Sequence, residues 1–207
     1  MFVRQFMTSQ VITVRPNDTI ADTMTVMRER KINRLPVVDH GKVVGLVTDG
    51  DLREISPSPA TTLSIFELNY LVAKTAIREV AVKKVITCTA DTRIEEAALL
   101  MREHKIGGLP VVEGEKLVGI ITETDIFDAF IDIMGFRSPG ERVVIETKDQ
   151  VGVMLDLAGT IQEYGVNIAS LAFYHLPENK AQIIARLNGD QVNEAKKSLV
   201  DKGYLLK

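Results

Sequence analysis

The chain contains a long internal repeat, and this repeat constrains the fold more than any other feature of the sequence. A shift of 74 residues aligns 3–52 with 77–126 without a gap, and about 19 of the 50 aligned pairs are identical. The identities include "LPVV", a central glycine and a final Thr-x-x-Asp. We therefore expect a duplicated structural unit over the first two thirds of the chain.

Each copy predicts the order β-α-β-β-α. A short extended piece, 11–14 in the first copy and 85–88 in the second, precedes a helix whose apolar residues recur at helical spacing. Two runs rich in Val and Ile then predict a hairpin, and a second helix is expected to begin near Asp51 or Asp125. Asp18 and Thr92 are the expected N-caps of the first helix in each copy.

A different pattern follows Pro139-Gly140, where we expect a domain boundary. Strand-like and helix-like segments alternate from there to the C-terminus in the order β-α-β-β-α-β, the ferredoxin-like plan. Asp190 is the expected N-cap of the last helix. The fold class is thus α/β, or α+β, with a duplicated unit followed by a ferredoxin-like domain.

Composition narrows the classes of function. The chain has 25 basic and 28 acidic residues and no basic block, so nothing favours nucleic acid as a partner. No apolar run reaches the ~18 residues of a membrane span, and the N-terminus has no signal-peptide core. The single cysteine, Cys88, fits a reducing compartment, and we interpret it as a core residue. A cytoplasmic location is therefore expected.

Sequence motifs give no support to catalysis or to a metal site. Neither of the glycine-rich phosphate-binding patterns nor the G-x-S-x-G nucleophile pattern occurs. The histidines are scattered, and one cysteine does not make a structural zinc site. We expect no enzyme activity, no catalytic residue, no metal and no cofactor.

The Thr-x-x-Asp that ends each hairpin has two interpretations. The aspartate can cap a helix, since a carboxylate accepts the unpaired N–H groups of the first turn. Alternatively, a strand that leads into a helix presents N–H groups suited to phosphate, the threonine hydroxyl adds a donor, and the carboxylate accepts bonds from ribose hydroxyls. The residues alone leave both open.

The duplicated unit resembles a pair of CBS domains, known as a Bateman module. The shared features are "INRLPVVD", "KVVGLVT" and the closing Thr-x-x-Asp, all repeated in register. The C-terminal part resembles an ACT domain through "DQVGVMLDLAGTIQEYGVNI". This combination is similar to the acetoin-utilisation accessory proteins of bacteria. The predicted organisation is CBS repeat 1 over 1–56, a linker helix over 57–76, CBS repeat 2 over 77–134 and an ACT domain over 140–207.

The CBS resemblance implies that an adenosine nucleotide binds at two sites as a regulatory ligand. Threonine and aspartate of the motif would hold phosphate and ribose, and the base would lie near the partner copy. One implied site comprises Thr48, Asp51, Ile86, Thr87 and Gly108. The other comprises Thr122, Asp125, Ile12, Thr13 and Arg34.

Three of the implied positions have alternative explanations. Gly108 stands where the first copy has Arg34, so one site is expected to lose a phosphate contact, unless Arg34 is only a solvated surface residue. Gly152 and Asn167 match positions that line an amino-acid effector site in ACT domains. Gly152 equally suits a turn into a helix, and Asn167 equally suits a backbone hydrogen bond.

The resulting hypothesis is a regulatory ligand-sensing protein. The CBS pair would bind AMP, ADP, ATP or a related nucleotide, and the ACT domain would dimerise or bind a small effector. A homodimer is implied by both families, and binding would modulate a partner enzyme, such as one of acetoin catabolism. The alternative is a structural adaptor or oligomerisation module without a ligand.

Overall fold

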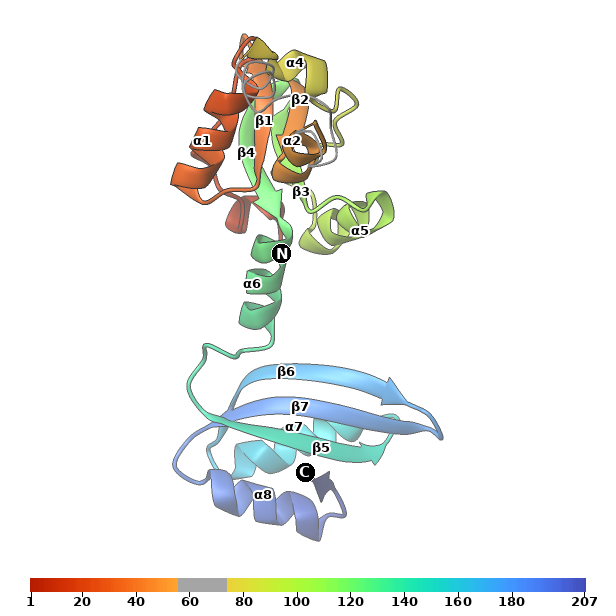
Figure 1. Cartoon of the computed structure of the whole chain (residues 1–207). Helices are drawn as coiled ribbons and strands as arrows, with labels where there is room; N and C mark the ends of the chain where they lie inside the picture. Colours follow the sequence, from red (N-terminus) through yellow and green to blue (C-terminus); the bar gives the residue numbers. More distant parts are fainter. Residues whose placement is uncertain (56–73) are drawn as a thin grey trace, which may run out of the picture. The chain divides into compact units, whose positions relative to one another are not determined.

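The computed structural model describes residues 1–55 and 74–207, which form two compact units, Met1–Ile126 and Phe127–Lys207. Figure 1 shows the helices and strands of both units. In the described ranges, no helix has the length and apolar character that crossing a membrane requires. The linker helix predicted over 57–76 lies almost entirely outside the described residues, so it stays a prediction.

The first unit is built on a four-stranded antiparallel sheet with the order β1-β2-β4-β3. Each copy contributes one hairpin, and the two hairpins meet where Lys42 of β2 pairs with Lys116 of β4. Both predicted hairpins are confirmed. In the first of them His40 and Gly41 form the turn, and both residues have positive φ. The strands are β1 (Arg34–Asp39), β2 (Lys42–Thr48), β3 (Gly108–Glu113) and β4 (Lys116–Thr122).

The helices of the two copies occupy equivalent places in the order of elements. Each copy has a longer helix before its hairpin and a helix that begins directly after it, so the α-β-β-α part of the predicted order is confirmed, whereas the strand predicted before it does not form. The short segments η1 (Val3–Gln5) and α4 (Ile77–Val80) lead the two copies. The other helices are α1 (Ile20–Arg30), α2 (Asp49–Ile55), α5 (Ile94–His104) and α6 (Glu123–Ile133).

The segment that leads each copy is paired with the other copy. Thr8 exchanges backbone hydrogen bonds with Ile120 of β4, at 2.9 and 3.0 Å. Val82 makes the same exchange with Leu46 of β2, at 2.9 and 3.0 Å. Ile77 accordingly lies in the core of the first copy. This crossing brings residues that precede one hairpin beside the Thr-x-x-Asp of the other.

Several sequence-based details need correction. The N-cap of α1 is Thr19, whose side chain accepts the Asp22 N–H, whereas Asp18 accepts the Arg15 N–H in the preceding turn. At α5 the helix begins after Arg93, and Thr92 instead accepts a bond from Thr89. The last helix is likewise capped at Gln191 and not at Asp190.

The pieces predicted as extended, 11–14 and 85–88, each make only one parallel bridge. Val14 pairs with Val37, and Cys88 pairs with Val111. Cys88 is buried as expected, and this burial raises the pKa of its thiol to about 11.

The second unit confirms the predicted β-α-β-β-α-β order. Its four strands form one antiparallel sheet with the order β6-β7-β5-β8, and Figure 1 shows both helices on the same face of it. Alternate residues of β7, such as Ile183 and Leu187, are fully buried in the core. The elements are β5 (Glu141–Lys148), α7 (Val153–Glu163), β6 (Asn167–Leu176), β7 (Lys180–Asn188), α8 (Val192–Asp201) and β8 (Leu205–Leu206).

Tyr204 joins the C-terminal segment to α7. Its hydroxyl donates to Oδ2 of Asp156 at 2.7 Å, and Lys202 donates to Oδ1 at 3.2 Å. Burial and this carboxylate raise the pKa of Tyr204 to about 12, from an ordinary 10.0. The bond from Tyr204, followed by that from Lys202, lowers the pKa of Asp156.

We predict that Tyr204→Phe raises the pKa of Asp156 toward its ordinary value, which NMR titration of the carboxyl group measures. A lowered carboxyl pKa stabilises above the unfolded pKa, and that stability is lost as pH falls through the folded pKa. The variant should therefore lose less stability on acidification. The raised pKa of Tyr204 itself contributes to the stability of the fold. This contribution is complete below pH 10.0 and is lost as pH rises toward about 12. An unchanged Asp156 pKa in the variant would assign the shift to Lys202 alone.

Candidate functional site

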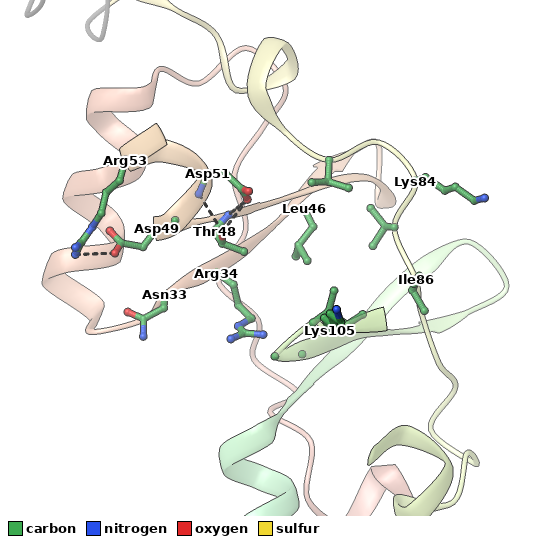
Figure 2. Close-up of a pocket in the computed structure, with 16 residues that line it drawn as sticks. Asn33, Arg34, Leu46, Thr48, Asp49, Asp51, Arg53, Lys84, Ile86 and Lys105 are labelled. Atoms are coloured by element: carbon green, nitrogen blue, oxygen red, sulfur yellow. Dashed lines mark hydrogen bonds and ion pairs between the residues drawn. The ribbon is translucent and has the colours of Figure 1, made fainter. Parts of the chain in front are cut away.

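The Thr-x-x-Asp of each copy closes into the same hydrogen-bonded turn at a strand-to-helix junction. The backbone N–H and the hydroxyl of Thr48 donate to Oδ2 of Asp51 at 2.8 and 2.7 Å (Figure 2). Thr122 makes the same two bonds to Oδ2 of Asp125, both at 2.7 Å. In the first copy the Asp51 N–H also donates back to the Thr48 hydroxyl at 3.2 Å.

This geometry revises the capping interpretation. The second helices begin at Asp49 and Glu123, so the threonine is at the N-cap and the aspartate is the third helical residue. The arrangement is a capping box in which aspartate replaces the usual glutamate. Thr19 and Asp22 form a similar pair at α1, with bonds of 2.7 and 3.1 Å. A Thr-x-x-Asp cap alone therefore does not identify a ligand site.

Each of the two hairpin motifs also lines a cavity, and neither of these two cavities includes Thr19 or Asp22. The first cavity has a volume of about 610 Å³, and Thr48 and Asp51 form part of its wall. Leu46, Val82 and Ile86 supply an apolar surface, the last two from the segment that leads the other copy. Its remaining lining residues are Asn33, Arg34, Asp49, Gly50, Arg53, Lys84, Val85, Lys105, Ile106, Gly107 and Gly108.

The second cavity is related to the first by the repeat and is smaller, about 330 Å³. Thr122 and Asp125 line it together with Ile12 and Ile120. Both volumes fall within the range of ordinary small-molecule sites, about 300–1,000 Å³. The other lining residues are Thr8, Gln10, Val11, Lys31, Ile32, Asn33, Arg34 and Thr124.

The structure brings together most of the residues that the sequence placed at each site. Ile86 and Gly108 lie at the first cavity, and Ile12 and Arg34 lie at the second. Thr13 and Thr87 are next to these positions in sequence, but neither lines its cavity. Arg34 lines both cavities, whereas the sequence placed it at the second site only.

One oxygen of each motif aspartate remains available to a ligand. Oδ2 of Asp51 and of Asp125 accepts both threonine bonds. Within residues 1–55 and 74–207, Oδ1 of neither aspartate accepts a hydrogen bond. A half-buried carboxylate oxygen of this kind can accept a bond from a ligand hydroxyl.

The threonine hydroxyls are less suited to phosphate than the sequence suggested. Each hydroxyl has one proton, and in this structure it is donated to the aspartate. The first amide of each helix is also occupied, because the N–H of Asp49 donates to the Asn33 carbonyl and that of Glu123 to the Gly107 carbonyl. The lining cations are better placed to meet an anionic group.

Sequence reasoning missed the lysines of the two cavities. Lys105 lines the first cavity and Lys31 the second, at equivalent positions after α5 and α1. Both have φ of 54°, a left-handed conformation that glycine adopts at lower cost. Lysine occupies this position in both copies although the conformation favours glycine, and the repeated lysine could have indicated a role in ligand binding. Lys84 in the first cavity left no such signal, since its counterpart is Gln10.

Gly152 and Asn167 are not brought together within one chain. Gly152 precedes the first residue of α7 with φ of 91°, as its conformational role requires, and Asn167 begins β6 after the other end of that helix. Between them lies α7, whose 11 residues span about 16 Å at 1.5 Å per residue.

Comparisons with known sequences point to one family. The family model of the CBS domain matches residues 3–58 and 77–132, which together are more than half of the chain. CBS domain-containing protein YhcV of Bacillus subtilis is 30% identical over 124 residues, covering 60% of this chain and 81% of YhcV. Protein MJ1404 of Methanocaldococcus jannaschii, which is uncharacterized, is 35% identical over 135 residues, but the match spans only 32% of its length.

Solved structures give the same result for the same part of the chain. AcuB from Vibrio cholerae, assigned to acetoin utilization, is 30% identical with a TM-score of 0.56, covering 68% of this chain and 98% of its own. CBSX2, solved in complex with AMP, is 30% identical with a TM-score of 0.54, covering 64% and 97%. The CBS domain pair of protein MJ0100, solved with 5'-methylthioadenosine and S-adenosyl-L-methionine, is 30% identical with a TM-score of 0.53, covering 63% and 99%.

Proposed function

The chain belongs to the CBS-domain family, and on that premise we propose that its two Thr-x-x-Asp cavities bind adenosine-containing ligands and that this binding regulates a partner. The observation that carries the proposal is the combination found twice at equivalent places: a free aspartate oxygen, an apolar wall and nearby cations. The aspartate oxygen can bind the ribose hydroxyls, the apolar wall can contact the base, and the cations can meet the phosphate. Two related pairs, CBSX2 and that of MJ0100, were solved with such ligands.

Within each cavity we assign roles by chemistry. Oδ1 of Asp51 or Asp125 accepts the ribose hydroxyls, and Ile86 or Ile12 contacts the base. Phosphate is met by the cations at the cavity, among them Lys105 or Lys31. Thr48 and Thr122 position the aspartates through the bonds described above. Thr13, Thr87 and Gly108 remain proposed contacts of the ligand.

Calorimetric titration tests the proposal. The purified chain is titrated separately with AMP, ADP, ATP, S-adenosylmethionine and NADH. We expect at least one of them to bind in the micromolar to submillimolar range at the two cavities. Absence of binding by all five at millimolar concentration would reject the sensor function and favour an adaptor.

Lys105→Gly separates binding from folding at the first cavity. Because Lys105 has a left-handed conformation, glycine should leave stability unchanged or raise it by up to about 1 kcal/mol. Loss of an exposed charge near phosphate should weaken AMP binding by about fivefold. Thermal unfolding and calorimetry measure the two effects.

Lys105→Gln is the matched control, since it removes the charge but keeps the left-handed cost. It should weaken AMP binding to a similar degree without any gain in stability. Wild-type AMP affinity in both variants would remove Lys105 from the proposed site.

We propose further that 140–207 is an ACT domain that dimerises or binds a small effector near Gly152 and Asn167. The β-α-β-β-α-β order supports this, and the places of the two residues before and after α7 are compatible with a site completed by a second chain. The domain bounds 1–56, 77–134 and 140–207 are part of the proposal. A metabolic enzyme as the regulated partner, including one of acetoin catabolism, is suggested by the resemblance to AcuB.

An adaptor without a ligand is the second candidate. It is favoured by exposed apolar side chains on and after α6, where Phe127 is 66% exposed and Phe130 52%. Apolar residues this exposed are typical of surfaces that contact another protein. Negative titrations with all five ligands, together with a stable oligomer, are the result this candidate expects.

A further inference from the structure

Arg34 is a charged residue at a position where the second copy has glycine. Asn33-Arg34 of the first copy corresponds to Gly107-Gly108 of the second. The guanidinium of Arg34 lies against these glycines: a Cβ on Gly107 would be 2.5 Å from Nη2, and one on Gly108 would be 2.8 Å from Nη1. Figure 2 shows the Arg34 side chain extending toward the segment of Lys105. The second copy therefore has no side chains where the first copy's arginine lies.

The same side chain lines both cavities. Arg34 is among the residues around the first cavity and among those around the second. It is half-buried, and no residue that the structure describes forms a hydrogen bond or ion pair with it. Burial lowers the pKa of its guanidinium, and the nearby charge of Glu123 opposes this shift. A partly desolvated guanidinium without a partner has five N–H donors ready for an anion.

The two cavities depend on Arg34 to different degrees. The first cavity also has Lys84, Lys105 and Arg53, although Arg53 is paired with Asp49 at 2.7 Å. In the second cavity the counterpart of Lys84 is Gln10, so Lys31 is the other cation of its lining. Losing Arg34 to a ligand in the first cavity would thus remove one of two cations from the second.

We infer that Arg34 is a phosphate-binding residue shared by both cavities, so that a phosphorylated ligand in one cavity weakens the binding of a phosphorylated ligand in the other. This inference rests on the proposed nucleotide function and adds a rule of occupancy to it. A bidentate contact to a phosphate in one cavity orients the guanidinium toward that phosphate, and the other cavity then holds a second anion less tightly. A ligand without phosphate, such as adenosine, does not compete for Arg34 and can fill either cavity.

The coupling is measured with full-length single-cavity variants. Asp125→Ala leaves AMP binding mainly at the first cavity, and Asp51→Ala leaves it mainly at the second. For independent cavities, the product of these two association constants equals the product of the two stepwise constants of the wild-type chain. For AMP we expect the wild-type product to be lower by about tenfold or more.

Two comparisons assign the coupling to Arg34 and phosphate. With adenosine as the probe, the product of the wild-type stepwise constants should agree within about threefold with the product from the single-cavity variants. When Arg34→Gln is added to all three chains, the two products of AMP association constants should also agree within about threefold. AMP should then bind more weakly at both cavities. Arg30→Gln, a change of the same type at an exposed residue outside both cavities, should behave as the wild type.

Each contrary result identifies what failed. Two results would overturn the sharing of Arg34 while leaving nucleotide binding intact. One is a product of the wild-type stepwise constants for AMP that equals the product from the single-cavity variants. The other is coupling as strong with adenosine as with AMP. AMP coupling that persists in full in Arg34→Gln would do the same. Absence of binding by both AMP and adenosine would overturn the proposed function and this inference with it.

Discussion

Asp51→Ala is expected to weaken AMP binding at the first cavity by about 10- to 150-fold while lowering the free energy of unfolding by only about 1 kcal/mol. The large effect follows from the free Oδ1, which we assign to the ribose, since a hydrogen bond to a charged group contributes about 1.5–3 kcal/mol. The small effect follows from Oδ2, which caps the helix through Thr48. Calorimetry and chemical denaturation measure the two quantities separately.

Asp22→Ala is a matched control for this prediction. Asp22 accepts the hydroxyl of Thr19 at 2.7 Å in the same kind of cap, but it lines neither cavity. Its loss should cost a similar stability, about 1 kcal/mol, and leave AMP affinity unchanged. If Asp51→Ala and Asp22→Ala have the same effect on both quantities, the motif is a helix cap and the ribose assignment fails. Asp125→Ala repeats the test at the second cavity.

Leu157→Ala is expected to lower the stability of the second unit by about 2–5 kcal/mol. Leu157 is completely buried on α7, in a core that includes Ile161, Ile183 and Leu199. The change removes apolar contacts and leaves a cavity that the surrounding strands and helices fill only in part. Denaturant unfolding measures the loss. AMP affinity should stay within about twofold under native conditions, because no residue of α7 lines either cavity.

Leu155→Ala is the control on the same helix. Leu155 is 79% exposed, so the same chemical change there should alter stability by no more than about 0.5 kcal/mol. Equal losses from the two substitutions would mean that α7 does not bury the face described here.

Much of the fold could be predicted from the sequence because the decisive patterns are local and occur twice. The apolar runs on either side of His40-Gly41 predict a hairpin, and the glycine supplies the conformation that the turn requires. The helix starts differ from the predicted ones by one or two residues, because neighbouring polar residues can cap the helix or close the preceding turn. Thr19 and Asp18 illustrate this, since only the structure shows which of them caps α1 and which closes the preceding turn.

The candidate site was predictable in its motifs but not in its charges. Thr48 and Asp51 stand out because their spacing is repeated, and the crossing of the lead segments places Ile86 beside them. That Arg34 would lie over Gly107 and line both cavities depends on contacts between residues about 74 positions apart, which no local pattern records. From the sequence, Gly108 indicates the loss of a phosphate contact, whereas in the structure Gly107 and Gly108 make room for Arg34.

A structure of the chain with bound AMP tests the central claim most directly. The claim predicts a ribose hydroxyl within hydrogen-bond distance of Oδ1 of Asp51 or Asp125, about 2.5–3.0 Å, and the base against Ile86 or Ile12. It further predicts that the phosphate of at least one nucleotide contacts Arg34. Nucleotide bound elsewhere, with no ligand atom bonded to Oδ1 of either aspartate, would contradict it.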